Sequence, residues 1–186
     1  MLIGIVGLNG SGKDTVADYL VTTYNWAHKD LGQEIRDELK ILGRDYQDRS
    51  VMTEYANYKR KTLGADYWCK KALSSLNSDY IVITSIRNPA EAQLIKTKGG
   101  KIVEIFAEDK TRFDRTRERV KNNPNAHGDV ESFEQFKARQ QVELEHPDPS
   151  KQQLLACIAM ADYRLDNDSS KESLYKQVDE LFKKLE

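Results

Sequence analysis

The stretch at residues 2–15, LIGIVGLNGSGKDT, decides the fold of this chain. It begins with LIGIV, a short apolar run of the kind that makes a buried parallel strand. Gly7, Gly12 and Lys13 then satisfy the spacing G-x-x-x-x-G-K, and apolar residues recur at helical spacing after the loop. This order of strand, glycine loop and helix predicts a phosphate site, because successive backbone N–H groups converge on phosphate oxygens at the positive end of a helix.

The loop is predicted to bind the phosphates of ATP. Gly10 and the small Ser11 allow the chain to wrap closely around a phosphate group. Lys13 is predicted to reach the β- and γ-phosphates as a mobile positive charge, and it is therefore also a candidate catalytic residue. The nucleotide-binding residues predicted in this loop are Gly7, Asn9, Gly10, Ser11, Gly12, Lys13, Asp14 and Thr15.

The loop departs from its usual pattern at Asp14, where a Ser or Thr hydroxyl ordinarily binds Mg²⁺. A carboxylate is also a suitable Mg²⁺ ligand, although without the metal it places negative charge near the phosphates. Thr15 lies one position further round the helix and replaces the missing hydroxyl only if the register shifts. Asp14 and Thr15 are therefore both candidate metal ligands. The alternative is that Asp14 merely stabilises the N-terminus of the helix.

The rest of the chain alternates strand-like and helical segments. Further strands are predicted at residues 80–84, 102–106 and 163–165, and helices at residues 89–98 and at the C-terminus. This alternation predicts an α/β fold of three layers, in which helices flank a mainly parallel sheet.

The 186 residues are long enough for one domain, and we predict a single domain over residues 1–186. Two polar, mostly helical insertions interrupt its core, at about residues 32–77 and about residues 109–149. The predicted core consists of residues 1–31, 78–108 and 150–186.

The composition argues against several classes of protein. Lys and Arg number 29 against 30 for Asp and Glu, so the chain lacks the basic excess expected of a protein that binds extended nucleic acid. Cys69 and Cys157 lack metal-ligand spacing, and reduced thiols are expected. No apolar run has the length of a transmembrane helix, and LIGIV is too short for a signal peptide. We therefore predict a cytoplasmic protein without a membrane partner; its oligomeric state stays open.

The placement of arginines indicates a second anionic ligand. A phosphoryl-transfer enzyme holds two anionic partners together and neutralises charge on the transferred group, tasks that suit planar guanidinium groups. Arg87 follows the predicted strand at residues 80–84, at the carboxyl end where open α/β sheets bind ligands. Arg36 and Arg60 lie in the first insertion. A solvated surface position is the alternative for any single arginine in so charged a chain.

Three further arginines, Arg112, Arg115 and Arg119, are spaced i, i+3 and i+7 at the start of the second insertion. This spacing places them on one face of a helix. One interpretation is a lid that covers the phosphates. The other is a helix face that forms salt bridges with neighbouring Asp and Glu residues.

The sequence does not identify a residue that would act as a general base. The predicted strand at residues 80–84 is followed by Ser85 rather than by an acidic residue. Asp30 receives no chemical assignment from its spacing, and no Ser, His and Asp or Cys and His grouping is apparent. The base, if the reaction needs one, is therefore unassigned.

Four segments in order resemble the nucleoside monophosphate kinase superfamily, and the resemblance extends over nearly the whole chain. They are GSGKDT, RKTLGADYW, SIRNPAEAQLIKTKGGKIVEI and ADYRLDNDSSKESL. Within this superfamily, the chain resembles phage-type deoxynucleoside monophosphate kinases, dephospho-CoA kinases and archaeal adenylate-kinase-like proteins. GSGKDT looks like the loop of the phage enzymes with Asp14 included, which implies that an Asp here is compatible with activity.

The resemblance implies a role for each part of the chain. The ATP phosphates would lie on residues 7–15 and the adenine near Asn167, while the second insertion would close as a lid. The acceptor would lie in the first insertion. Lys13, Arg87, Arg115 and Arg119 would be catalytic by position and charge, and Arg36, Arg60 and Arg87 would bind the acceptor.

The expected activity is therefore transfer of the γ-phosphoryl group of ATP, with Mg²⁺, to a nucleoside or deoxynucleoside monophosphate. Two alternatives remain open. One is a dephospho-CoA-kinase-like enzyme that phosphorylates a hydroxyl group. The other is a nucleotide-binding regulator that hydrolyses ATP slowly.

Overall fold

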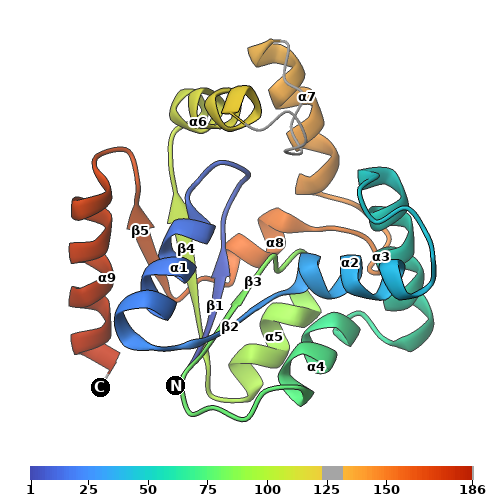
Figure 1. The fold of residues 1–186 in the computed structure, drawn as a ribbon, viewed down its shortest axis with the longest axis horizontal. Coiled ribbons are helices and arrows are strands. Elements are labelled where there is room, and N and C mark those ends of the chain that lie inside the picture. Colours follow the sequence, from blue (N-terminus) through green and yellow to red (C-terminus); the bar gives the residue numbers. More distant parts are fainter. Residues whose placement is uncertain (123–131, 186) are drawn as a thin grey trace.

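The computed structural model describes residues 1–122 and 132–185, and a parallel β-sheet is at its centre (Figure 1). In this part of the chain all strand pairs are parallel, and the sheet order is β2-β3-β1-β4-β5. The predicted class, a three-layer α/β fold with a mainly parallel sheet, is therefore confirmed. The strands are β1 (Leu2–Val6), β2 (Ala27–Asp30), β3 (Ile81–Thr84), β4 (Lys101–Phe106) and β5 (Tyr163–Asp166).

Strand β1 lies in the middle of the sheet, between β3 and β4. Leu2 pairs with Ile81 of β3, and Ile3 with Lys101 of β4. Four of the five residues of β1 are buried, as its continuous apolar run predicts for a strand covered on both faces. The loop after β1 therefore lies at the centre of the side of the sheet where the strands have their carboxyl ends, here called the carboxyl edge. Open α/β sheets bind ligands at this side.

Strand β2 was not predicted, because its sequence, AHKD, has no apolar pattern. It is an edge strand whose residues are all half-buried. Asp30 pairs with Thr84, the last residue of β3. This pairing places the Asp30 carboxylate at the carboxyl edge beside the turn that begins at Ser85.

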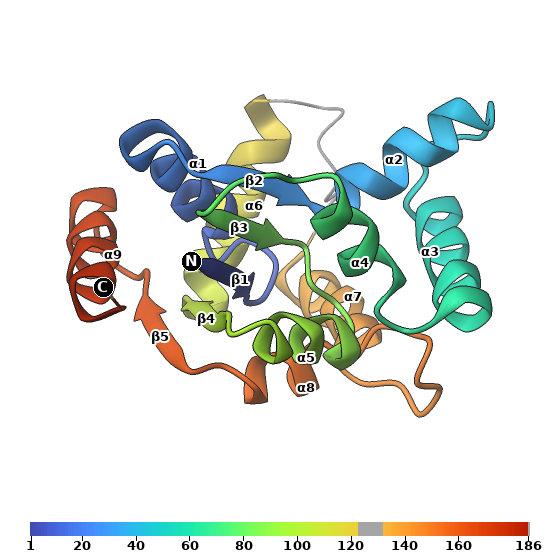
Figure 2. The ribbon, with the colours of Figure 1, turned by 90° about the horizontal axis from the view of Figure 1, so that it is seen from below.

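Helices cover both faces of the sheet, as Figure 2 shows with the strands nearly end-on. One face packs on α1 and α9 through a cluster that includes Ile5, Leu20 and Leu174. The opposite face packs on α4, α5 and α8 through a second cluster that includes Trp68 and Ile95. The five helices are α1 (Lys13–Tyr24), α4 (Tyr67–Ser74), α5 (Pro89–Thr97), α8 (Leu154–Ala159) and α9 (Lys171–Leu185).

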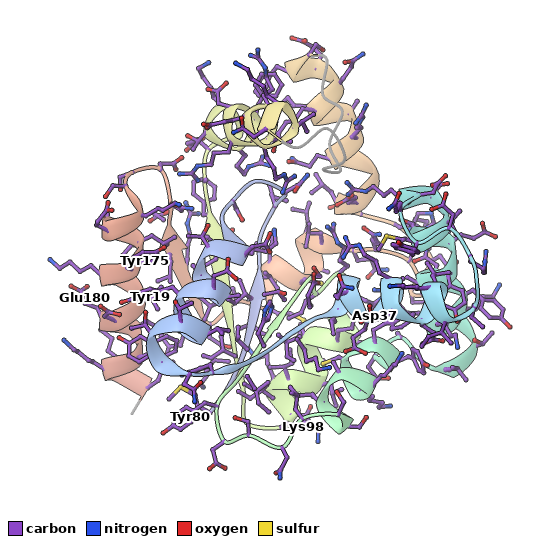
Figure 3. All side chains as sticks on the ribbon, viewed as in Figure 1. Tyr19, Asp37, Tyr80, Lys98, Tyr175 and Glu180 are labelled. Carbon is purple, nitrogen blue, oxygen red and sulfur yellow. The ribbon has the colours of Figure 1, made fainter. Side chains whose placement is uncertain are left out.

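An aromatic pair joins the helix after the loop to the C-terminal helix. The rings of Tyr19 in α1 and Tyr175 in α9 stack with their centroids 4.0 Å apart, and Figure 3 shows both between these helices. The Tyr19 hydroxyl also donates to Asp179 Oδ1 at 2.8 Å. Helix α1, which carries the loop on its N-terminus, is thereby fixed to the last element of the chain.

The remaining helices surround the carboxyl edge. Asp30 begins α2 as its N-cap, since its carboxylate accepts a hydrogen bond from Gly32 N at 2.8 Å. Asp48 caps the next helix in the same way. None of the helices in the described ranges has the length and apolar character needed to cross a membrane. The helices at this edge are α2 (Leu31–Ile41), α3 (Arg49–Leu63), α6 (Asp109–Asn122) and α7 (Phe133–Leu144).

A buried ion pair connects α3 to the turn after β3. Glu91 is completely buried in the first turn of α5, and Arg60 of α3 is 3% exposed. Arg60 Nε donates to Glu91 Oε1 at 2.9 Å, while the backbone N–H groups of Arg87 and Asn88 donate to Glu91 Oε2 at 2.9 and 3.1 Å. One carboxylate thus closes the capping box of α5 and fixes the turn that carries Arg87.

We predict that Glu91→Ala lowers the free energy of unfolding by about 3–5 kcal/mol, because it leaves the buried Arg60 charge without its partner. Urea unfolding followed by circular dichroism measures the loss. The control is Glu180→Ala, which removes an exposed acid of α9 that is 4.0 Å from Lys176. It should change stability by less than about 0.5 kcal/mol. Equal, small losses in both variants would contradict the structural role of the pair.

Candidate functional site

The glycine loop is held between α6 and the end of β5. A Cβ atom at Gly10 would lie 2.6 Å from the Arg112 carbonyl oxygen, and one at Gly12 would collide with the Asn167 side chain. Both glycines also have left-handed backbones, with φ of 81° and 101°. Asn167 Nδ2 donates to the Ser11 carbonyl at 2.7 Å. Asn167 therefore lies directly against the loop, on the side of β5.

Lys13 lies back over its own loop, where its Nζ donates to the Leu8 carbonyl at 2.9 Å. Burial, with a further contribution from Arg87 and smaller ones from Arg112 and Arg119, lowers the pKa of Lys13 to about 7. The neighbouring Asp14 opposes this shift. The positive surroundings of Lys13 disfavour its own charge, which is the environment expected of a site that awaits an anion.

A cavity of about 340 Å³ extends from the loop to α2 and α3. Seven predicted site residues line it: Asn9, Lys13, Asp14, Arg36, Arg60, Arg87 and Arg119. The other lining residues come from the ends of β2 and β3, from α2 and α3, and from the segment before α8. They are Asp30, Gly32, Ile35, Arg49, Met52, Thr53, Ala56, Ser85 and Gln152.

Several predicted site residues lie outside this cavity lining. Thr15 is half-buried in α1, whereas the exposed Asp14 lines the cavity. Arg115 Nη2 is 3.4 Å from Asn167 Oδ1, so these two side chains meet on the other side of the loop. The remaining loop residues outside the lining are Gly7, Gly10, Ser11 and Gly12.

Arg60 both lines the cavity and forms buried structural contacts, and the sequence alone could not distinguish these two roles. Its guanidinium lines the cavity, yet Nε is bound to the buried Glu91 and Nη1 donates to Asn57 Oδ1 at 3.3 Å. These fixed partners make Arg60 part of the wall of the site. Its freedom to follow a ligand is correspondingly small.

Asp30 and Ser85 add polar groups that the sequence left without a role. Asp30 Oδ2 is 3.9 Å from Arg36 Nη1, so the carboxylate faces one of the predicted acceptor arginines. Ser85 follows β3 with a φ of 59°, a conformation that non-glycine residues adopt only at a cost. Both residues lie at strand ends, and this position could have indicated from the sequence that they belong to the site. For Asp30 it could not be recognised, because β2 has no apolar pattern and was not predicted as a strand.

Arg49 is a further cavity residue that was not predicted. It is the first residue of α3, and nothing in its local sequence distinguishes it from a surface arginine. Its guanidinium forms an ion pair with Glu143 near the end of α7, and Glu143 also pairs with Arg87. Burial lowers the pKa of Arg87 to about 10, at which the group is still charged at neutral pH.

A family model described as an AAA domain matches residues 3–137. The chain belongs to the AAA domain family. This AAA domain is 29% identical over 191 residues to a UPF0200 protein of Staphylothermus marinus, with 99% of this chain and 92% of the relative covered. A UPF0200 protein of Thermoplasma volcanium is 28% identical over 179 residues, with 95% and 93% covered.

Solved structures show the same fold. A shikimate kinase from Acinetobacter baumannii in complex with shikimate superposes with a TM-score of 0.61 at 18% identity, covering 100% of this chain and 94% of that chain. A shikimate kinase from Bacteroides thetaiotaomicron gives a TM-score of 0.62 at 15% identity, with 98% of each chain covered. This AAA domain therefore has a P-loop kinase fold, which confirms the fold implied by the resemblance to the nucleoside monophosphate kinase superfamily.

The three spaced arginines of α6 have different surroundings in this AAA domain. Arg112 is completely buried, and its guanidinium donates to the carbonyls of Ala107 and Asn9 at 3.0 and 3.1 Å. It also donates to Gln140 and Asp109 at 2.5 Å each. Arg112 thus forms the ion pair with a neighbouring Asp that the salt-bridge interpretation predicts, but it is buried, and it joins the loop to α7. Arg115 faces Asn167, and Arg119 lines the cavity.

We predict that Arg112→Lys lowers the free energy of unfolding by about 2–4 kcal/mol, because an ammonium group cannot reproduce the planar set of donors that four acceptors require. The control is Arg117→Lys on the exposed side of α6, where the change should be less than about 0.5 kcal/mol. Thermal unfolding measures both variants. Similar melting temperatures for the two would show that the buried guanidinium is dispensable.

Proposed function

We propose that this AAA domain transfers the γ-phosphoryl group of ATP to a small acceptor that carries a phosphate group, with a nucleoside or deoxynucleoside monophosphate as the first choice. The observation that supports this proposal is that one continuous cavity extends from Lys13 at the loop to Arg36, Arg49 and Arg87. It contains cationic groups for two anionic ligands, with the transferring group between them. Neutralising charge on that group is the main task in phosphoryl transfer.

The nucleotide would bind on both sides of the loop. Its phosphates would accept hydrogen bonds from the loop amides and lie at the N-terminus of α1. Arg115 and Asn167 lie against the opposite side of Gly12, outside the acceptor cavity, and this position favours contact with the nucleoside part of ATP. The role proposed for Arg115 is thus on the ATP side, whereas Arg87 and Arg119 lie where the two ligands meet.

The residues present fit Mg²⁺. Asp14 and Asp30 both line the cavity, and Mg²⁺ in phosphate sites is commonly held by one or two carboxylates, several waters and the substrate phosphates. No group of three or more His, Cys, Asp or Glu residues suitable for a metal occurs in residues 1–122 and 132–185. We assign Asp14 rather than Thr15 to the metal, because Asp14 is the residue at the cavity. When bound, Mg²⁺ would neutralise charge on the ATP phosphates.

The chain's own residues would then act by position and charge. Lys13 would leave the Leu8 carbonyl for the phosphates, which accept its hydrogen bonds more strongly. Arg36 and Arg87 would orient the acceptor, and Arg119 would stabilise charge on the transferring group. Residues of α6 and α7 would exclude water, so that the γ-phosphoryl group reaches the acceptor and is not hydrolysed.

A hydroxyl group is the second candidate acceptor, and Asp30 favours it. A phosphate acceptor is already ionised at neutral pH, whereas a hydroxyl acceptor benefits from a carboxylate that takes its proton. Asp30 is at the carboxyl edge within the cavity, 3.9 Å from Arg36. A dephospho-CoA-like molecule, which carries both a phosphate and a hydroxyl, would use the arginines and Asp30 together.

ADP release measured in a coupled assay, across nucleoside monophosphates, deoxynucleoside monophosphates and dephospho-CoA, tests the proposal. At least one monophosphate should stimulate release, and Lys13→Ala should lower kcat/KM by at least about 100-fold, since it removes a cation from the transferring phosphate. The control is Lys110→Ala, an exposed lysine of α6 whose removal should leave the rate unchanged. Stimulation by dephospho-CoA alone would select the hydroxyl kinase. ADP release that no acceptor stimulates would contradict both.

We also predict that ATP binding is coupled to proton uptake by Lys13. With a pKa of about 7, free Lys13 is mostly neutral at pH 8, whereas phosphate oxygens would restore its charge. Calorimetry at pH 8 in buffers of different ionisation enthalpy should therefore show net uptake of protons on ATP binding, on the order of one per ATP bound. Lys13→Arg, whose guanidinium is always charged, should abolish the uptake. Equal uptake in both proteins would assign the proton to another group.

A further inference from the structure

Glu143 is an acidic side chain from α7 that lies among the cavity arginines. One of its carboxylate oxygens pairs with Arg49 of α3, and the other pairs with Arg87 after β3. The Glu143 side chain is 15% exposed. An anion from the second insertion therefore bridges two cations that belong to different parts of the acceptor cavity.

Arg49 and Arg87 differ from the arginines with structural roles. The Arg60 and Arg112 side chains are 2% and 0% exposed and have several fixed partners. Arg49 and Arg87 are 46% and 25% exposed, and both line the cavity. Within residues 1–122 and 132–185, no carboxylate other than that of Glu143 forms an ion pair with either of them. Both guanidiniums are thus accessible and held by the same exchangeable anion.

The surroundings of this bridge are strongly positive. Burial, together with Arg139, Arg119 and Arg36, lowers the pKa of Arg49. Asp30 and Glu91 act on Arg87 in the opposite sense, and the carboxylate in direct contact with both arginines is that of Glu143. A phosphate monoester carries more charge than a carboxylate and offers three acceptor oxygens, so it is the better ligand for two guanidinium groups.

We infer that Arg49 and Arg87 form the subsite for the phosphate of the acceptor, and that Glu143 occupies this subsite in the free protein as an internal competitor. The inference deepens the proposed function and rests on it for the identity of the ligand. Binding of the acceptor replaces the Glu143 carboxylate and releases the last turn of α7. Neutral acceptors cannot displace the carboxylate, so the contact also selects for acceptors that carry phosphate.

An internal competitor lowers the apparent affinity by the fraction of molecules in which the subsite is free. If Glu143 occupies the subsite about nine-tenths of the time, the acceptor binds about tenfold more weakly than the arginines alone would permit. Removing the charge of Glu143 should recover that factor without any new contact. This gain distinguishes a competitor from a residue that merely positions the arginines.

The experiment measures the binding of inorganic phosphate by calorimetry, in full chains that all carry Lys13→Ala to weaken the loop as a second phosphate site. Glu143→Gln, which keeps the shape and removes the charge, should tighten phosphate binding about tenfold. Glu145→Gln removes the same charge from an exposed position two residues on, and should change affinity less than about twofold. The gain from Glu143→Gln should disappear when Arg49→Gln is added.

Unchanged or weaker phosphate binding in a folded Glu143→Gln chain would overturn the inference, as would an equal gain in Glu145→Gln. If Glu143→Gln fails to fold, Glu143→Asp replaces it; its shorter side chain cannot span both arginines and should give a gain of about threefold. The measurement requires no catalysis. If the chain with Lys13 intact phosphorylates no acceptor while the Lys13→Ala series shows the gain, the proposed function is refuted and the phosphate subsite stands.

Discussion

The buried Glu91 carboxylate is the contact on which the rest of the site depends. It holds Arg60 of the α3 wall and the backbone amides of Arg87 and Asn88 at the same time. The side chain of Asn88 in turn donates to the carbonyls of Pro149 and Lys151, at 2.7 and 3.0 Å. One buried acid thus fixes the acceptor wall, the arginine after β3 and the segment that follows α7. Because it is buried, its hydrogen bonds are strengthened by the low local dielectric.

The charge of the cavity explains why its carboxylates matter as much as its arginines. The whole chain has a formal net charge of −1, yet arginines from α2, α3, α6 and the turn after β3 meet in one cavity. Mutual repulsion of these groups opposes folding until an anion neutralises part of the charge. In the free protein the Asp30 and Glu143 carboxylates neutralise part of this positive charge. A bound phosphate would replace Glu143 in this role. The positive charge that opposes folding would therefore also be what attracts the proposed acceptor.

Much of the fold followed from local sequence, whereas much of the site did not. The loop was predictable because its function requires adjacent residues, and β1, β3 and β4 were predictable because each is an apolar run. Arg49 and Glu143 are separated by 94 positions, so neither has a local pattern that reveals the other. Likewise, the spacing of Arg112 and Arg119 placed them on one face, but burial against the loop separates their roles. Such distinctions depend on packing between distant segments.

The loop would also separate the two ligands proposed for this site. Gly12 has no side chain, and only this absence lets Asn167 reach the Ser11 carbonyl from β5. On the other side, Lys13 and Asp14 face the arginine cavity. A larger residue at Gly12 would separate β5 from the loop and move the loop toward the acceptor side. Gly12 is therefore required for the packing of Asn167 against the loop, in addition to its proposed role in phosphate binding. Asp14, by contrast, is exposed and faces the cavity, where a carboxylate and the metal proposed for it would have room.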